Sequence, residues 1–183
     1  KKVVSAGGVS DGAFSFTSDT NLGNFNLSTN NGAASTNTVA IPTGNYEIAE
    51  LVPSGWSLTD LGCEGALTVE GASKVTIAAT AGANIECTFE NKRDTANITI
   101  NKTAEGGDST FSFTSTSAKG NFDLTTIGGT STTGSFAVPT GSYDFAETVP
   151  SDWTLTGISC SGTSATVAKP KVTINASAGD NIV

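Results

Sequence analysis

The chain has 183 residues, 14% of them charged, with a formal net charge of −8 and no histidine. The acidic balance argues against a nucleic-acid surface, because phosphate binding needs clustered lysine and arginine. The absence of histidine excludes Ser–His–Asp hydrolases and histidine-based zinc sites, and no apolar run is long enough to span a membrane.

The sequence repeats itself at an offset of 97 positions without any insertion, and about half of residues 14–86 are identical to their counterparts in residues 111–183. A gap-free period of this length indicates two copies of one domain, because solenoid units run only about 20–50 residues. We therefore predict one domain in residues 1–93 and a second in residues 94–183.

Apolar residues alternate with polar ones throughout, which predicts short half-buried strands. Glycine, proline and asparagine separate these strands, and no segment has a helical period. Each copy is therefore predicted to be an all-β, antiparallel, immunoglobulin-like sandwich. In the first copy the alternating pairs are, in chain order, Phe14/Phe16, Phe25/Leu27, Val39/Ile41, Tyr46/Ile48, Trp56/Leu58, Val75/Ile77 and Cys87/Phe89.

The junction between the copies, at residues 92–95, contains neither glycine nor proline. We expect the last strand of the first copy to lead almost directly into the second copy, as a stiff connection. Tyr46 follows a tight turn at residues 42–44, which is similar to the tyrosine corner of Greek-key sandwiches.

The three cysteines follow the repeat. Cys63 and Cys87 lie in one copy, and a disulfide between them would stabilise it by about 3–4 kcal/mol; the alternative is two buried thiols in a reducing compartment. Cys160 is the counterpart of Cys63, and the counterpart of Cys87 would come directly after Val183. We therefore expect the natural protein to continue with a cysteine, and we expect a structural role for Cys160, since no histidine is present to activate its thiol.

Acidic residues are scattered, with no run that resembles a calcium loop, so the sequence predicts neither a metal site nor a cofactor. Trp56 and Trp153 stand in the same repeated context. We expect both indole rings to pack over one end of a sandwich; the alternative is an aromatic platform for sugars.

The repeated motifs at residues 111–114, 139–150 and 158–160, together with residues 86–91 of the first copy, resemble the prealbumin-like (SpaA-like) repeat of bacterial surface proteins. This group is related to the B-type domains of Gram-positive collagen adhesins and pilins. The resemblance covers essentially the whole chain. It implies sandwiches of seven or slightly more strands in tandem, in a stalk, an adhesin or a fibre.

The resemblance also implies candidates for an internal isopeptide bond, in which a first-strand lysine joins a last-strand Asn or Asp beside a glutamate. Lys102 and Glu147 are the candidates in the second copy, whose Asn would lie beyond the end of the sequence. The first copy has Glu50 and Asn91 but Ser5 at the lysine position, so that set is vestigial. Strand parity places these polar groups on the core face. They could equally be a buried Lys102–Glu147 ion pair and a Glu50–Asn91 hydrogen bond.

These observations favour a structural repeat segment of a secreted or cell-surface bacterial stalk or adhesin, a rigid spacer without catalytic turnover. The first alternative is a filament or pilus subunit assembled by strand complementation, and the second is a carbohydrate- or collagen-binding module. The expected partners are further copies of the repeat or neighbouring chains. The sequence identifies no host or matrix ligand.

Overall fold

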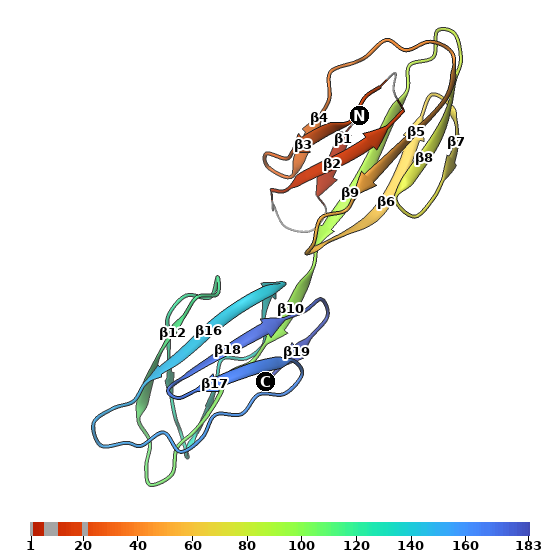
Figure 1. Cartoon of the computed structure of the whole chain (residues 1–183). Helices are drawn as coiled ribbons and strands as arrows, with labels where there is room; N and C mark the ends of the chain where they lie inside the picture. The colour runs from red at the N-terminus through yellow and green to blue at the C-terminus, as the bar shows by residue number, and fades with distance from the viewer. Residues whose placement is uncertain (1, 6–10, 20–21) are drawn as a thin grey trace. The chain divides into compact units, whose positions relative to one another are not determined.

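The computed structural model describes residues 2–5, 11–19 and 22–183, and the chain divides into two compact units, Lys1–Arg93 and Asp94–Val183 (Figure 1). Every helix or strand assigned within these residues is a β-strand. No helix in this part of the chain is long and apolar enough to cross a membrane.

Unit 1 has a four-stranded sheet in the order β4-β1-β9-β6 and a five-stranded sheet in the order β3-β2-β5-β8-β7. The two sheets form the layers of a sandwich (Figure 1). The strands are β1 (Lys2–Ser5), β2 (Ala13–Ser18), β3 (Phe25–Ser28), β4 (Ala33–Ser35), β5 (Gly44–Leu51), β6 (Trp56–Glu64), β7 (Leu67–Glu70), β8 (Lys74–Ala79) and β9 (Glu86–Arg93).

Unit 2 repeats the five-stranded sheet in the order β13-β12-β16-β18-β17, but its other layer is divided into β15-β10-β19 and β11-β14. The strands are β10 (Thr95–Ile98), β11 (Asn101–Thr103), β12 (Thr110–Ser115), β13 (Phe122–Thr125), β14 (Thr130–Thr132), β15 (Phe136–Pro139), β16 (Gly141–Thr148), β17 (Ser164–Ala168), β18 (Lys171–Ala176) and β19 (Asn181–Ile182).

The all-β sandwich prediction is confirmed, with one departure from antiparallel pairing in each unit. β1 pairs with β9 in parallel, and β10 pairs with β19 in parallel, whereas every other described strand pair is antiparallel. The first and last strands of a unit are therefore neighbours that run in the same direction. A period-two pattern cannot reveal this, because it reports which face is buried and not which strand is adjacent.

Residues 39 and 41 were predicted to form a strand, and this prediction is wrong. No strand is assigned at residues 36–43, and the side chain of Val39 is 57% exposed. The corresponding segment of unit 2 is the strand β15, which is held by antiparallel pairing to β10. In the described part of unit 1 no strand pairs with residues 36–43, and alternation alone cannot maintain a strand without a partner.

The core of unit 1 is one continuous cluster. The eight buried side chains come from both sheets, and Phe89 on β9 lies among them, completely buried. Its ring packs edge-on against Phe16, with the ring centroids 5.3 Å apart. The buried residues of the cluster are Phe14, Phe16, Leu27, Ile48, Val75, Ile77, Cys87 and Phe89.

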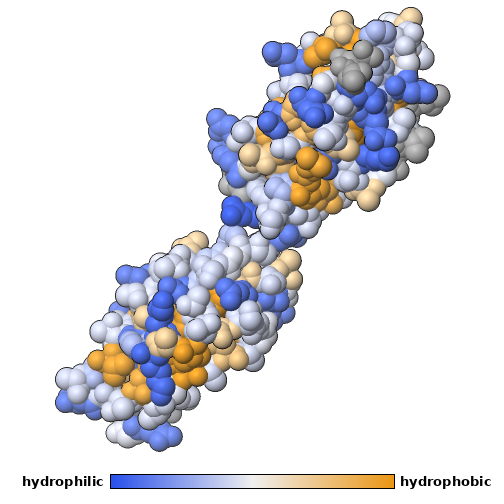
Figure 2. Space-filling view, in the orientation of Figure 1, coloured by the Kyte–Doolittle hydropathy of each residue, from blue (hydrophilic) through white to orange (hydrophobic). Residues whose placement is uncertain are grey.

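The buried core of unit 2 is divided into two clusters. One contains Phe145 and Ile174 among its eight buried residues, and the other contains Phe111, Phe113 and Leu124. The partly buried Ile100 and Phe122 contact both. Hydrophobic side chains also remain at the surface of each unit between hydrophilic ones (Figure 2).

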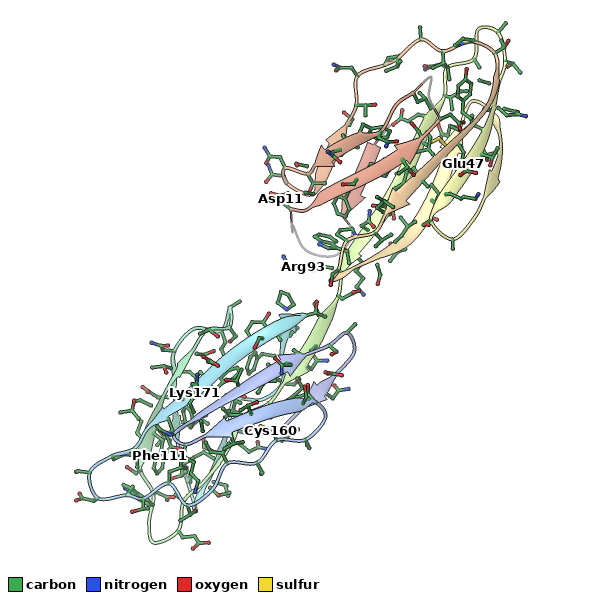
Figure 3. The ribbon with its side chains drawn as sticks, in the orientation of Figure 1. Asp11, Glu47, Arg93, Phe111, Cys160 and Lys171 are labelled. Atoms are coloured by element: carbon green, nitrogen blue, oxygen red, sulfur yellow. A yellow bond between two sulfur atoms is a disulfide. The ribbon has the colours of Figure 1, made fainter. Side chains whose placement is uncertain are left out.

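The junction between the units follows the prediction, since β9 ends at Arg93 and β10 begins at Thr95 with only Asp94 between them (Figure 3). The stiffness of this connection stays a prediction.

Candidate functional site

Lys102 and Glu147 meet inside unit 2. Lys102 lies on β11 and Glu147 on β16, and the Lys102 Nζ is 2.9 Å from Glu147 Oε1 and 3.0 Å from Oε2. The side chains are only 12% and 5% exposed. Strand alternation turns both toward the interior, and pairing neutralises charges that would be unfavourable there alone. The isopeptide role of the pair stays a prediction.

Phe111 completes the surroundings of this pair, and the sequence analysis did not identify it. The Lys102 Nζ lies 4.1 Å from the centroid of the Phe111 ring, a cation–π distance. Trp153 packs edge-on against the same ring at 5.1 Å. Strand alternation could have predicted this contact, because Phe111 is the first inward-facing aromatic residue of β12, the strand that follows β11.

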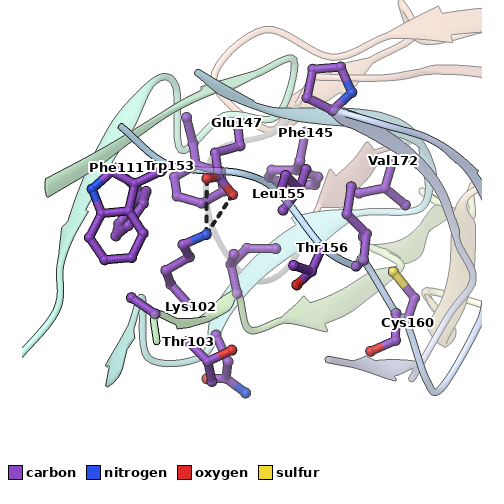
Figure 4. A pocket seen from close by; sticks show the side chains of 18 of the residues that line it. Lys102, Thr103, Phe111, Phe145, Glu147, Trp153, Leu155, Thr156, Cys160 and Val172 are labelled. Atoms are coloured by element: carbon purple, nitrogen blue, oxygen red, sulfur yellow. Dashed lines mark hydrogen bonds and ion pairs between the residues drawn. The ribbon is translucent and has the colours of Figure 1, made fainter. Parts of the chain in front are cut away.

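A groove of about 870 Å³ runs from the Lys102–Glu147 pair along the interior of unit 2. Trp153 lines one end and Cys160 the other, and Leu155 lies between them (Figure 4). The groove is walled on one side by residues 152–161, a segment with no assigned strand, although its counterpart in unit 1 is the strand β6. Apolar side chains such as Leu155 and Val172 and polar side chains such as Thr156 and Ser159 line it together, with the Lys102–Glu147 ion pair at one end.

Glu50 and Asn91 occupy the corresponding position in unit 1. Asn91 Nδ2 donates a hydrogen bond to Glu50 Oε1 at 2.8 Å. Glu50 is 3% exposed and Asn91 is completely buried. The Asn91 Oδ1 atom is buried and has no hydrogen-bond partner in the described part of the chain.

Neither alignment of the first strands puts a lysine of unit 1 at the position that corresponds to Lys102. Ser5 lies directly across from Asn91 in the parallel β1–β9 ladder. The antiparallel neighbour of the first strand gives a different alignment. In unit 2, Lys102 pairs with Ser131. The counterpart of Ser131 in the repeat is Ala34, and Ala34 pairs with Val3. In the structure Lys102 therefore corresponds to Val3, two residues before Ser5, which is its counterpart at the 97-residue offset. A shift of two residues leaves each side chain on the same face of the strand.

Cys63 and Cys87 form a disulfide between β6 and β9, at directly opposed positions. Cys160 is a free, half-buried cysteine beside the groove (Figure 4). Burial raises the pKa of the Cys160 thiol above its ordinary value, so the protonated form is favoured near neutral pH.

The tryptophans pack as predicted for core residues. Trp56 contacts Phe14 edge-on at 5.1 Å, which matches the Trp153–Phe111 contact of unit 2, and both indoles are partly buried. This packing against a buried phenylalanine favours the predicted core role over an exposed aromatic platform. Within the described residues, no group of three or more Cys, Asp or Glu side chains could hold a metal ion.

The model of the prealbumin-like fold domain matches residues 1–93 and again residues 98–183. The chain belongs to this prealbumin-like family. Both units are thus prealbumin-like domains, and the resemblance read from the sequence is confirmed. A search of curated proteins found no match.

Two solved structures are distantly similar to the chain. The Bacillus anthracis TIE protein has 17% identity and a TM-score of 0.43, and the alignment covers 97% of this chain and 31% of that one. The major pilin protein T-13 from Streptococcus pyogenes has 14% identity and a TM-score of 0.43, with 100% of this chain and 94% of that one covered. The chain thus spans less than a third of the Bacillus anthracis protein.

Proposed function

We propose that the chain is a structural segment of a bacterial cell-surface protein, in which two prealbumin-like units act as spacers without catalytic turnover. The observation that carries this proposal is the duplication: one domain is built twice, and both copies match the same family. A tandem of small domains adds length and multivalency, whereas an enzyme needs one good site.

The cross-link in unit 1 supports a location outside the cell. Disulfides persist in oxidising environments and are rare in the bacterial cytosol, and Cys63–Cys87 links two adjacent strands of one sheet. A covalent link between strands suits a module that has to resist extension or proteolysis.

The spacer proposal is tested by cell labelling and single-molecule pulling on the full chain. Antibodies against the chain should label intact cells, and pulling should give two separate unfolding steps. The disulfide holds 24 residues out of the extension of unit 1, so a reducing agent should lengthen one step and leave the other unchanged. Detection only in the cytosol, or a single cooperative step, would contradict the proposal.

We also propose that Lys102 and Glu147 take part in forming an isopeptide bond, Lys102 as the attacking amine and Glu147 as the group that transfers the proton. In that reaction the uncharged Lys102 amine attacks an Asn carboxamide carbon. A new C–N amide bond forms, the original carboxamide C–N bond breaks and ammonia leaves, while Glu147 relays the proton from the amine to the leaving group. The 2.9 and 3.0 Å contacts between Lys102 Nζ and the two carboxyl oxygens of Glu147 support this role.

The isopeptide proposal is tested by intact mass, with a strand that contains Asn supplied to unit 2. Bond formation removes one ammonia from the combined mass, and Lys102→Arg should abolish the change because the guanidinium is not a nucleophile at neutral pH. An unshifted mass for the wild-type complex would rule the bond out.

A filament subunit that accepts a strand from a neighbouring chain is the second candidate function. The groove of unit 2 is the observation that favours it, because apolar side chains such as Leu155 and Val172 line this groove beside polar ones. Concentration-dependent polymerisation of the full protein is the expected result, and a monomer at all concentrations would contradict this candidate.

A further inference from the structure

The outer edge of the five-stranded sheet is a place where the two units differ in charge. β17 is the last strand of this sheet in unit 2, and β7 is the last strand in unit 1 (Figure 1). Within the described residues, β17 pairs with β18 alone and β7 with β8 alone. An edge strand leaves a row of backbone N–H and C=O groups without partners, and a strand of another chain can pair with them.

This edge is separate from the groove. None of the residues of β17, all of which the structure describes, lines the groove. Unit 1 contains the strand β9 beside β6, and β7 is nevertheless the last strand of its own sheet. The free edge is therefore a property of the domain that both units share.

The side chains of β17 are uncharged and mostly exposed. Natural edge strands commonly carry a charged residue, which hinders pairing with another chain. In unit 1 the counterpart of Val167 is Glu70, so β7 has such a charge and β17 lacks it. Four of the five side chains of β17 are exposed, namely those of Ser164, Thr166, Val167 and Ala168.

β17 is suited to pairing with a second copy of itself. In an antiparallel pair with a two-fold axis at Thr166, the two Thr166 residues lie opposite each other, and Ala165 of one copy lies opposite Val167 of its partner. Ala165 and Val167 lie on the core face, because they pair with the buried Ile174 and Val172 of β18. Opposed side chains thus share a face, and threonine pairs and apolar pairs across strands stabilise a sheet.

Opposite charges flank the two ends of β17. Lys169 directly follows the strand, and its ammonium donates to the Thr156 carbonyl at 2.7 Å, which leaves further N–H donors of the same group. At the other end, a side chain at Gly162 would collide with the carbonyl oxygen of Asn181, so Asp180 lies beside this end. In an antiparallel pair the Lys169 end of each copy lies beside the Asp180 end of the other, and the charges are complementary at both ends.

Unit 1 has neither of these flanking charges. The counterparts of Lys169 and Asp180 are Ala72 and Ala83. The same edge thus carries a carboxylate in the strand and no complementary charges at its ends in unit 1, whereas unit 2 has a neutral strand with opposite charges at its ends. This contrast favours self-pairing of β17 over self-pairing of β7.

We propose that β17 is an interaction surface for a second copy of this chain. The two β17 strands pair in antiparallel fashion about Thr166 and join two five-stranded sheets, with Lys169 of each copy close to Asp180 of the other. A two-fold contact of this kind closes at a dimer. It does not rest on the spacer or filament proposals, and it differs from strand complementation, which adds a chain at every step.

The test measures self-association by analytical ultracentrifugation of the full chain with Cys160→Ser, which excludes dimers linked through this thiol. We expect a reversible monomer–dimer equilibrium at low ionic strength, and weaker association in about 0.5 M salt, because salt screens the end charges. Hydrogen exchange should show protection of residues 164–168 in the dimer. A chain that stays monomeric up to about 1 mM would overturn the proposal, as would protection of residues 155–160 in place of residues 164–168.

Val167→Glu gives the edge of unit 2 the residue that unit 1 has. The carboxylate would lie within the paired strands, so association should weaken at least about tenfold. Ala72→Glu places an acid just beyond β7, at an exposed position, and this matched control should associate like the parent chain. Trp153 fluorescence in urea, in a Trp56→Phe background, checks that unit 2 stays folded. Unchanged association of a folded Val167→Glu chain would overturn the proposal, and growth beyond a dimer in that variant would assign the association to the filament candidate instead.

An exchange of the two end charges tests the antiparallel register. Lys169→Glu and Asp180→Lys should each weaken association about threefold to tenfold, because each change places like charges together. The chain with both changes has complementary charges again and should associate like the parent. Equal association of all four chains, or a double variant weaker than both single ones, would overturn the proposed pairing. None of these outcomes bears on the two-step unfolding expected of a spacer.

Discussion

Asn91 and Glu50 lie on opposite layers of unit 1 and are joined by a 2.8 Å hydrogen bond in the interior of the sandwich. In unit 2 the counterpart of Glu50 makes an ion pair with Lys102 instead. The glutamate is thus common to both units, and its partner differs. Each unit satisfies a buried carboxyl with a donor from the other layer, which fixes how the two sheets face each other.

Replacing Asn91 should destabilise unit 1 more than its small volume suggests. Asn91→Ala removes the Glu50 donor and opens space in the core, and we expect a loss of about 2–4 kcal/mol in the free energy of unfolding. Urea denaturation followed by Trp56 fluorescence in a Trp153→Phe background measures it. Thr88→Ala, a half-buried position on the same strand, is the control. An equal effect of the two changes would contradict the role given to the hydrogen bond.

The Lys102–Glu147 pair should show strong coupling between its members. Lys102→Met leaves the Glu147 carboxylate without its cation and should destabilise unit 2 by about 3 kcal/mol, whereas Lys102→Met combined with Glu147→Leu should lie much closer to wild type. Trp153 fluorescence in urea reports the change. Lys74→Met, which breaks the exposed Lys74–Glu47 pair, should change stability by less than about 1 kcal/mol. Additive effects of the two interior changes would count against a coupled pair.

Opening the disulfide should affect unit 1 alone. Cys63→Ser with Cys87→Ser releases a loop closed over 24 residues, and we expect unit 1 to lose about 3–4 kcal/mol of stability on the chain-entropy model. Trp56 and Trp153 report the two units separately, since each unit contains one tryptophan. Cys160→Ser serves as the control, and a large shift of the Trp153 transition in the double variant would be inconsistent with independent units.

The tyrosine hydroxyls should contribute equally in the two units. Tyr46 donates to the Pro42 carbonyl and Tyr143 to the Pro139 carbonyl, each at 2.7 Å, which is the local arrangement expected at a tyrosine corner. Tyr46→Phe and Tyr143→Phe should each reduce the free energy of unfolding by about 1–2 kcal/mol in the affected unit. Thermal unfolding of the single and double variants measures this, and an effect confined to one unit would be unexpected.

Unit 2 should lose stability on acidification. Hydrogen bonds from the Gly129 and Gly128 amides lower the pKa of Asp108, and hydrogen bonds from Thr173 and Lys171 lower that of Asp144. A carboxyl whose pKa is lower in the folded state stabilises the fold above its unfolded pKa of about 3.9, and this stabilisation disappears as the pH falls through the folded-state value.

The pH effect is measured as the urea midpoint of unit 2 at decreasing pH, followed by Trp153 fluorescence. Asp108→Asn with Asp144→Asn should flatten the dependence below the ordinary aspartate range and leave its shape near neutral pH unchanged. A dependence as steep in this variant as in the wild type would assign the acid sensitivity to other groups.

Much of the fold was predictable from residue order, because strand alternation and the 97-residue offset are local properties of the sequence. The inward parity of Lys102, Glu147 and Asn91 followed from the same rule, since successive side chains of a strand point to opposite faces. Strand alternation could not predict which inward-facing side chains contact one another. That depends on which strands become neighbours, and the parallel pairing of β1 with β9 brings the two ends of a unit together.

The sequence by itself determined the duplicated all-β domain and the core face of each strand, because period and parity are properties of residue order. Only the tertiary structure decided the two-residue shift of the first strand and the exposed segment around Val39. These depend on whether a strand finds a partner for its backbone hydrogen bonds. Residues 36–43 therefore form no strand, whereas β15, at the corresponding place in unit 2, pairs with β10.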